Sequence, residues 1–108
     1  MASISTNYKL IITDSAQEDI DQYIDTIIFA YDAPITAKKH YDGLYNVLKK
    51  IEQYPLSNSI RHNSSLLQYG CNVRRANYKK MAIIYTIHGN TIFIHRVVAA
   101  STITGASG

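Results

Sequence analysis

The residues of this sequence that could do chemistry are mostly basic, and they lie in its second half. All eight acidic residues fall between Asp14 and Glu52, so residues 1–52, which also hold five lysines, sum to a charge of −3. Residues 53–108 contain no acidic residue and sum to +6. Their six cations are Arg61, Arg74, Arg75, Lys79, Lys80 and Arg96. An acid-free, basic half predicts an anionic partner, which would be a nucleic acid or an acidic protein segment.

Other catalytic chemistry has little support in the sequence. The four histidines show no metal-ligand spacing and Cys71 is the only cysteine, so we expect no metal site, no cofactor and no disulfide. His95, next to Arg96, could act as a general acid, although a histidine on a strand is more often a hydrogen-bonded structural residue. We interpret Cys71 as a small buried residue. The sequence has neither a glycine-rich phosphate loop nor paired catalytic carboxylates.

The elements that must position these residues begin with a strand and two helices. Residues 8–13 are rich in β-forming side chains, which predicts a buried strand. Apolar residues recur at helical spacing over residues 16–31 and 37–51, and Ser15–Glu18 is a capping-box pattern. Residues 32–34 break the pattern, so we predict an antiparallel hairpin of helices of about 16 and 20 residues. The side chains expected to be nearly fully buried are Ile24, Ile28, Leu44 and Leu48.

The second half predicts a small sheet. Three apolar runs indicate strands at about residues 66–75, 80–87 and 91–99. Turn signals separate them at residues 76–77 and 88–90, and the tail from about 100 to 108 is expected to be frayed. We therefore expect one domain over residues 1–108, of the α+β class, in the order β-α-α-β-β-β. The helical hairpin would cover one face of a mainly antiparallel sheet, and the basic residues would gather on the other, partly open face.

The sequence also bears on location. No apolar stretch reaches the roughly 20 residues needed to cross a bilayer. The N-terminus lacks the basic region and apolar run of a signal peptide, so we expect a soluble cytoplasmic protein that does not bind membranes.

Several segments, taken in order, resemble the RelE/ParE superfamily of bacterial toxins. They are Tyr8–Leu10, Ser15–Ile20, Tyr23–Ile24, Ala37, Tyr54–Pro55, Val73–Arg75, Asn77–Tyr78, Ile83–Tyr85 and Ile92–Val97. No single segment is specific, but the ordered set extends from about residue 8 to 98. The resemblance implies the toxin of a type II toxin–antitoxin module of the plasmid-stabilisation kind. A partner antitoxin would neutralise it by wrapping around it in a hetero-oligomer.

The superfamily has two branches with different targets. RelE-like toxins enter the ribosomal A site and cleave mRNA, whereas ParE-like toxins inhibit DNA gyrase and are not known as nucleases. RelE-like chains often have Tyr-Arg where this chain has Met81-Ala82, and many relatives have His and Arg where it has residues 99–102. These differences, and the long helical hairpin, favour the ParE-like branch. The chain would then be no enzyme and would inhibit gyrase by binding.

Two sets of site residues follow from these alternatives. The partner-binding set is Arg74, Arg75, Lys79, Lys80 and Arg96. If the chain is instead a RelE-like ribonuclease acting on mRNA at the ribosome, the catalytic candidates are Arg74, Lys79, Lys80, His95 and Arg96. Arg74 alone matches a family arginine, and Lys79-Lys80 can equally be a charged turn that prevents edge pairing. A non-toxic relative that binds only its antitoxin is a third hypothesis.

Overall fold

The computed structural model describes residues 7–103. Its strands are β1 (Lys9–Ile12), β2 (Arg74–Tyr78), β3 (Met81–His88) and β4 (Thr91–Ala99), and its helices are α1 (Asp14–Tyr31) and α2 (Pro34–Gln53). Short 3₁₀ helices span Pro55–Ser57, Ser64–Tyr69 and Ala100–Thr102. The predicted α+β order, β-α-α-β-β-β, is confirmed.

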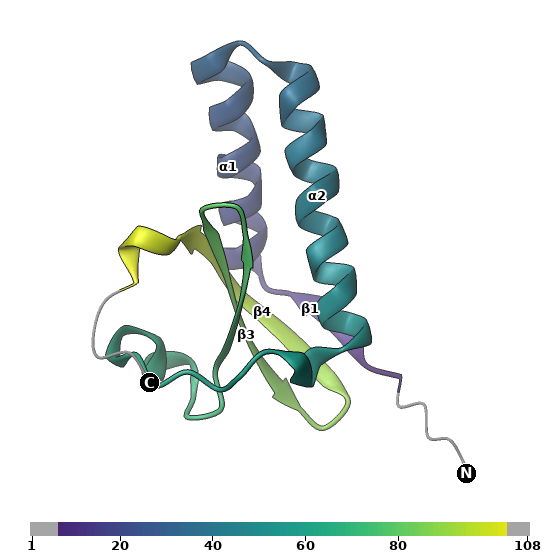
Figure 1. Ribbon diagram of the computed structural model, residues 1–108, viewed down its shortest axis with the longest axis vertical. Coiled ribbons are helices and arrows are strands. Elements are labelled where there is room, and N and C mark those ends of the chain that lie inside the picture. Colours follow the sequence, from purple (N-terminus) through teal and green to yellow (C-terminus); the bar gives the residue numbers. More distant parts are fainter. Residues whose placement is uncertain (1–6, 104–108) are drawn as a thin grey trace.

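The four strands form one sheet in the order β1-β4-β3-β2. β1 runs parallel to β4, and the other two pairs are antiparallel. β1 pairs only with residues 91–94, so the same edge of β4 has no neighbouring strand from His95 onward. The helical hairpin covers one face of the sheet, and its far end projects well beyond the strands (Figure 1).

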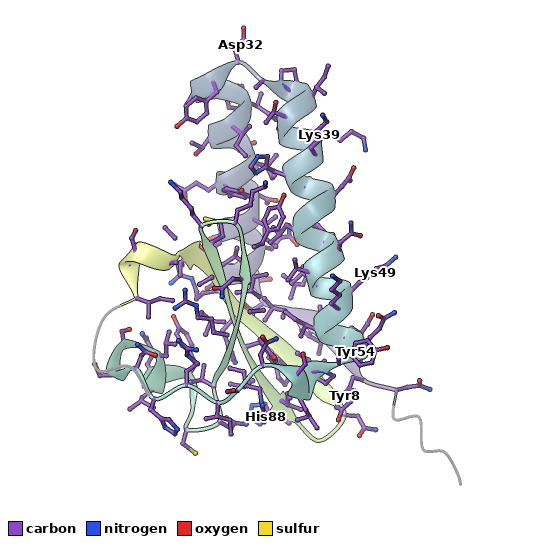
Figure 2. All side chains as sticks on the ribbon, in the orientation of Figure 1. Tyr8, Asp32, Lys39, Lys49, Tyr54 and His88 are labelled. Carbon is purple, nitrogen blue, oxygen red and sulfur yellow. The ribbon has the colours of Figure 1, made fainter. Side chains whose placement is uncertain are left out.

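Capping residues set the limits of the hairpin. Thr13, not Ser15, is the N-cap of α1, because its hydroxyl oxygen accepts a hydrogen bond from the Ala16 amide at 3.2 Å. The same hydroxyl lies 2.9 Å from the Ile94 carbonyl, to which it donates, so the cap also ties α1 to β4. At the far end of the hairpin (Figure 2), Asp32 closes α1 in the left-handed region, with φ of 47°.

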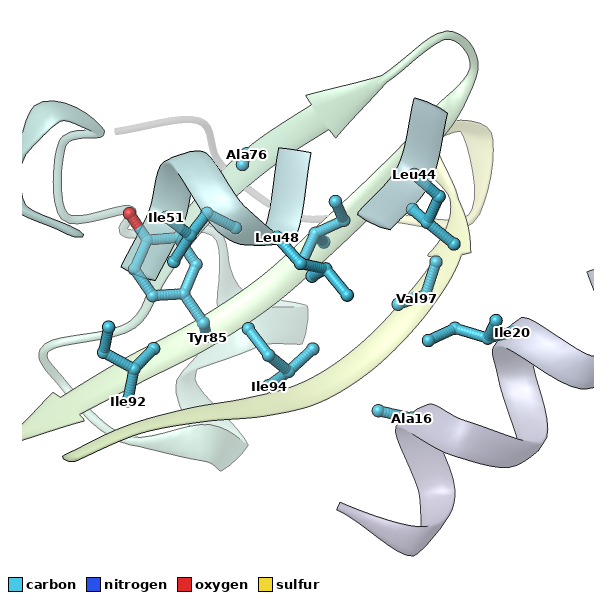
Figure 3. Close-up of a cluster of buried hydrophobic side chains, with 11 residues drawn as sticks. Ala16, Ile20, Leu44, Leu48, Ile51, Ala76, Tyr85, Ile92, Ile94 and Val97 are labelled. Carbon is cyan, nitrogen blue, oxygen red and sulfur yellow. The ribbon is translucent and has the colours of Figure 1, made fainter. Parts of the chain in front are cut away.

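The main core lies between the hairpin and the sheet (Figure 3). Its buried members are Ala16, Ile20, Leu44, Leu48, Ile51, Ala76, Ile83, Tyr85, Ile92, Ile94 and Val97. The prediction was correct for Leu44 and Leu48 but wrong for Ile24 and Ile28, which are only partly buried. The physical reason is that the second half of α1 extends past the sheet, so it has only α2 to pack against (Figure 1).

A second, smaller core lies on the sheet face opposite the hairpin. Leu66 and Val73 pack there with Ala82 and Ile84. The predicted strand at 66–75 was therefore wrong in its first eight residues, because this apolar run lies across the sheet as a 3₁₀ helix and loop. These residues cover part of the face that we expected to be partly open.

The turns differ in part from the predictions. Residues 76–77 lie inside β2, and the first hairpin turn is Lys79-Lys80, where Lys79 has φ of 53°. The second turn lies at Gly89-Asn90, as predicted, and Gly89 has the positive φ of 60° that favours glycine. Residues 100–102 form a 3₁₀ turn rather than a frayed tail, and residues 104–108 lie outside the described residues.

Candidate functional site

A groove of about 540 Å³ runs between α1 and the unpaired edge of β4. Gln22, Tyr23 and Thr26 line it from the helix, and Met81 and Ala99 line it from the sheet. Because no strand covers β4 beyond Ile94, its backbone groups face this groove. Such an edge can accept a further segment of protein in extended conformation.

An ion pair closes the inner end of the groove. The Arg96 guanidinium donates two hydrogen bonds to the Asp19 carboxylate, at 2.7 and 3.0 Å. The Val97 amide donates to the same carboxylate at 2.9 Å, so Asp19 occupies the position of a missing strand. The hydrogen bond that Arg96 donates to Asp19 raises the pKa of Arg96, and burial offsets this rise only in part. Arg96 is therefore charged but already paired within the chain.

A β-bulge separates Arg96 from its neighbour His95. Ile84 pairs with Arg96 and Tyr85 pairs with Ile94, so His95 is the extra residue of β4. Ile84 belongs to the core on the sheet face opposite the helices, so Arg96, which pairs with it, starts from the same face as His95, and its guanidinium reaches Asp19 at the free edge of β4. Simple strand alternation would put these two side chains on opposite faces, and the sequence gave no sign of the bulge that prevents it.

His95 belongs to a polar and aromatic cluster on that face. The Thr86 hydroxyl lies 2.8 Å from His95 Nε2 and 3.0 Å from His88 Nε2. The Tyr69 ring stacks on His95 with a centroid separation of 5.3 Å. Burial, followed by the nearby His88, lowers the pKa of His95, which favours a neutral imidazole.

The sequence prediction identified only His95 of this cluster. The missed signal was the spacing of two, Thr86 to His88 and Phe93 to His95, because strand residues two apart share a face. His88 and Phe93 also make an edge-on ring contact, with centroids 5.5 Å apart.

The predicted arginines of β2 do not lie together. Arg74 pairs with Tyr85 and Arg75 with Ile84, so their side chains leave opposite faces of the sheet. The Arg74 guanidinium donates to the Asn58 carbonyl, which ties β2 to the loop after α2. The Arg75 Nε donates to the Asn77 side chain at 2.9 Å.

The predicted lysines lie in the β2–β3 turn. The Lys79 ammonium is 5.7 Å from the centre of the Tyr78 ring, and both Lys79 and Lys80 are exposed. The structure therefore distributes the basic side chains over both faces and one turn: Arg75 and Arg96 flank Ile84 on the face opposite the helices, and Arg74 leaves the other face. Arg75, Lys79 and Lys80 stay accessible to a partner.

A second cluster that the sequence prediction missed joins the helices to β2. The Tyr23 hydroxyl and His40 Nδ1 are 2.6 Å apart, and the His40 ring meets Tyr78 edge-on. Gly43 makes room for Tyr78, because a Cβ at Gly43 would lie 2.4 Å from the tyrosine oxygen. Burial, followed by the nearby Tyr78, raises the pKa of Tyr23. These contacts are structural, since they hold the β2–β3 hairpin against the hairpin of helices.

Two further observations concern metal and membrane binding. Among residues 7–103, no three His, Cys, Asp or Glu side chains lie close enough to hold a metal ion. Within that range neither long helix is apolar enough to span a bilayer. Cys71 is exposed, so our prediction that it is buried was wrong; it lies in the turn before β2.

Comparisons with known proteins agree with this architecture. The comparison with curated proteins found no match. Among solved structures, a chain described as the chromosomal ParDE TA system from P. aeruginosa superposes with a TM-score of 0.71. It is 20% identical in sequence, and the match covers 88% of this chain and 98% of that one, which supports the fold alone. The family model described as the ParE toxin of the type II toxin–antitoxin system, parDE, matches residues 10–103. The chain therefore belongs to the ParE toxin family of type II toxin–antitoxin systems.

Proposed function

We propose that the chain is a cytoplasmic ParE-like toxin that inhibits DNA gyrase by binding to it, with no chemistry of its own. Its module would serve plasmid stabilisation or an equivalent chromosomal role. The chain belongs to the ParE toxin family, and its basic side chains are not gathered into one catalytic cluster. This second observation carries the proposal. Arg96, the cation nearest the groove, is paired with Asp19, and Arg74 is tied to the Asn58 carbonyl.

This dispersal weighs against RNA cleavage. A ribonuclease must neutralise a phosphate in the transition state and transfer protons, and general acid–base groups are each worth about 10²–10⁴-fold. Arg74 and Arg75 leave opposite sheet faces, and the position of a typical Tyr-Arg pair holds Met81 and Ala82. With these groups missing or dispersed, little cleavage activity would remain.

The groove between α1 and β4 is the proposed seat of the antitoxin. An extended antitoxin segment could add to the free edge of β4 from His95 onward, where the Val97 amide already donates to Asp19 and the His95 carbonyl already accepts from the Thr13 hydroxyl. From there an acidic segment could reach the accessible cations Arg75, Lys79 and Lys80. These three, with Arg74 and Arg96, form the proposed partner-binding set.

A supercoiling assay tests the function directly. Purified toxin is expected to inhibit gyrase in proportion to its concentration, and the small protein encoded beside it is expected to restore supercoiling. Translation of a defined message with the same toxin should leave the mRNA intact at the A-site codon. Codon-specific cuts that vanish in Arg74→Ala would overturn the proposal. Inhibition of neither system would point to a non-toxic relative.

Salt dependence tests the antitoxin contacts. Charge steering is screened over about 10 Å at 0.1 M salt, so binding of the neighbouring protein should weaken as salt rises. Replacing Lys79 and Lys80 by alanine should reduce that dependence. An affinity unchanged by salt and by both substitutions would contradict an acidic antitoxin segment at this turn.

One observation favours a second candidate, a ribosome-dependent mRNA endonuclease. Tyr69, Thr86, His88 and His95 meet on one sheet face, and such side chains can stack on bases and transfer protons. The translation assay decides between the two, because cleavage that is lost in His95→Ala would assign the chemistry to this cluster.

A further inference from the structure

We propose that the far end of the helical hairpin inserts into an apolar recess with a basic rim on the toxin's protein target. We call this end the hairpin tip and define it by Phe29 and Tyr31 at the end of α1 and Ile35 at the start of α2. The inference rests on the proposed function, in which the toxin acts by binding a protein. It assigns the contact surface and the chemistry that the target must offer.

The hairpin tip exposes three large apolar side chains to solvent. Phe29, Ile35 and Tyr31 are 79%, 75% and 73% exposed, the three highest values among the exposed large apolar side chains of residues 7–103. Single apolar side chains on a surface are ordinary, but three highly exposed ones at the same end of a helical hairpin favour a protein contact. Phe29 and Tyr31 are two positions apart, so they leave different sides of α1 and only a partner that surrounds the tip would cover both. Aromatic side chains are also enriched among the residues that dominate binding energy at interfaces.

The fold does not need these side chains. Near the tip the buried side chains of the two helices are Ile27 on α1 and Ala37 on α2. The tip residues are at least 73% exposed, and the tip itself lies beyond the sheet (Figure 1). Their exposure is therefore not a consequence of building the core.

Charge indicates the rim of the recess. α1 contains five acidic residues and no lysine or arginine, and its only ion pair within the described residues is that of Asp19 with Arg96. Asp25 and Asp32, close to the tip, have no cation partner within residues 7–103. On α2, Lys38 is neutralised by Asp42 at 2.9 Å. The α1 side of the tip is thus acidic, and a complementary rim is basic.

Shape favours a recess in another protein over a second copy of this chain. The tip is a convex end formed by two helices and their short connection (Figures 1 and 2). Two convex ends would touch over far less than the roughly 800 Å² per partner of a stable interface. A concave site surrounds such a knob and removes all three side chains from water.

The tip is also separate from the proposed antitoxin seat. Asp19, at the inner end of the groove, and Phe29 are ten residues apart on α1, which corresponds to about 15 Å along the axis. His88 lies at the other end of the molecule from Asp32 (Figure 2). None of the three tip residues lines the groove, but Phe29 is only three positions from Thr26, the outermost residue of the groove on α1. Binding of the neighbouring protein is therefore measured for the tip variant beside gyrase inhibition.

The test compares a tip variant with a matched control in the supercoiling assay. The tip variant is Phe29→Ser with Ile35→Ser, and the control is Leu56→Ser, which is 63% exposed but lies just after α2. We expect the half-inhibitory toxin concentration to rise at least about 10-fold in the tip variant, as for loss of an interface anchor, and to stay unchanged in the control. Asp25→Asn should raise the half-inhibitory concentration by a smaller factor and should make that concentration less dependent on salt.

Three outcomes would overturn the inference. The first is a tip variant that inhibits gyrase as well as the unchanged protein does. The second is a tip variant whose unfolding midpoint in urea falls far below that of the control, since the tip would then be part of the fold. The third is an unchanged toxin that sediments as a dimer and a tip variant that sediments as a monomer, because the tip would then bind a second copy.

A failure of the gyrase proposal gives a different pattern. If the unchanged toxin leaves gyrase active but arrests growth when expressed, the proposed target is wrong and growth arrest replaces supercoiling as the readout. Relief of arrest by the tip variant, but not by Leu56→Ser, would then support docking on another protein. Equal arrest by both variants would overturn the tip inference, and a chain that arrests nothing would overturn both proposals.

Discussion

Replacing Asp19 by alanine removes the group that closes the free edge of β4 beside α1. The Asp19 carboxylate accepts two hydrogen bonds from Arg96 and one from the Val97 amide. The Asp19 side chain is 14% exposed and that of Arg96 is 39% exposed. Arg96 therefore keeps access to water when its partner is lost, whereas Val97 is buried and its amide donates to the Asp19 carboxylate.

The magnitude follows from these three bonds. A half-exposed ion pair contributes only up to about 1 kcal/mol, because water screens the charges. A buried amide left without an acceptor costs about 1–3 kcal/mol. We therefore expect Asp19→Ala to lower the free energy of unfolding by about 2–3 kcal/mol. Asp19→Asn keeps an acceptor for the Val97 amide and loses mainly the charge, so its cost should be about 1 kcal/mol.

Urea unfolding of the two variants, with Arg96→Met as a third, measures these terms. Arg96→Met removes the ion pair but leaves Asp19 on the Val97 amide, so it should resemble Asp19→Asn. The reasoning is refuted if Asp19→Asn and Asp19→Ala are equally destabilising, because charge and not the backbone cap would then dominate. A loss below about 0.5 kcal/mol for Asp19→Ala would show that water or another side chain takes over the amide.

Three further predictions concern stability. Leu48→Ala should cost about 2–5 kcal/mol in urea unfolding, because Leu48 is buried in the main core, and a smaller loss would contradict tight packing there. Gly43→Ala should cost about 1–3 kcal/mol, since its Cβ would collide with both the hydroxyl and the ring of Tyr78. The same substitution should cost less in a Tyr78→Ala background, and an equal cost there would exclude this contact as the cause. His95 has a lowered pKa, so the folded state favours the neutral ring, and stability should fall as pH drops below the unfolded pKa of about 6.5. In thermal unfolding, His95→Gln should flatten this pH dependence. An equally steep profile in the variant would assign the pH dependence to another group.

The sequence predicted the elements that local periodicity controls. The two helices show a repeating apolar face, and the structure has them at Asp14–Tyr31 and Pro34–Gln53. The Gly89-Asn90 turn carries its own backbone preference, and it was also correct. In each case the information lies within a few neighbouring residues, so no knowledge of the rest of the fold was needed.

The errors involve contacts between distant residues. Leu66 and Val73 are apolar because they pack across the back of the sheet, and periodicity cannot distinguish that from a strand. Asp19 and Arg96 are 77 positions apart, and only the fold places the helix next to the bulge of β4. The candidate site residues were chosen by charge, whereas their availability depends on partners such as Asp19 and the Asn58 carbonyl, which the sequence alone does not place beside them.

The charge asymmetry of the sequence acquires a different meaning in the folded chain. Asp19 of the acidic half forms an ion pair with Arg96 of the basic half, so part of the charge imbalance is neutralised within the molecule. Three cations of the basic half, Arg75, Lys79 and Lys80, remain accessible on β2 and in its turn, while acidic residues without cation partners within residues 7–103 lie along α1 toward the tip. A toxin must bind an antitoxin and a target, and two surfaces of opposite charge allow these partners to be chemically different. The antitoxin segment at the turn would be acidic, and the rim of the target site would be basic.

This arrangement also predicts that a short antitoxin fragment bound only in the groove would bind the toxin without blocking its tip. Full neutralisation would then need a longer segment that continues along α1.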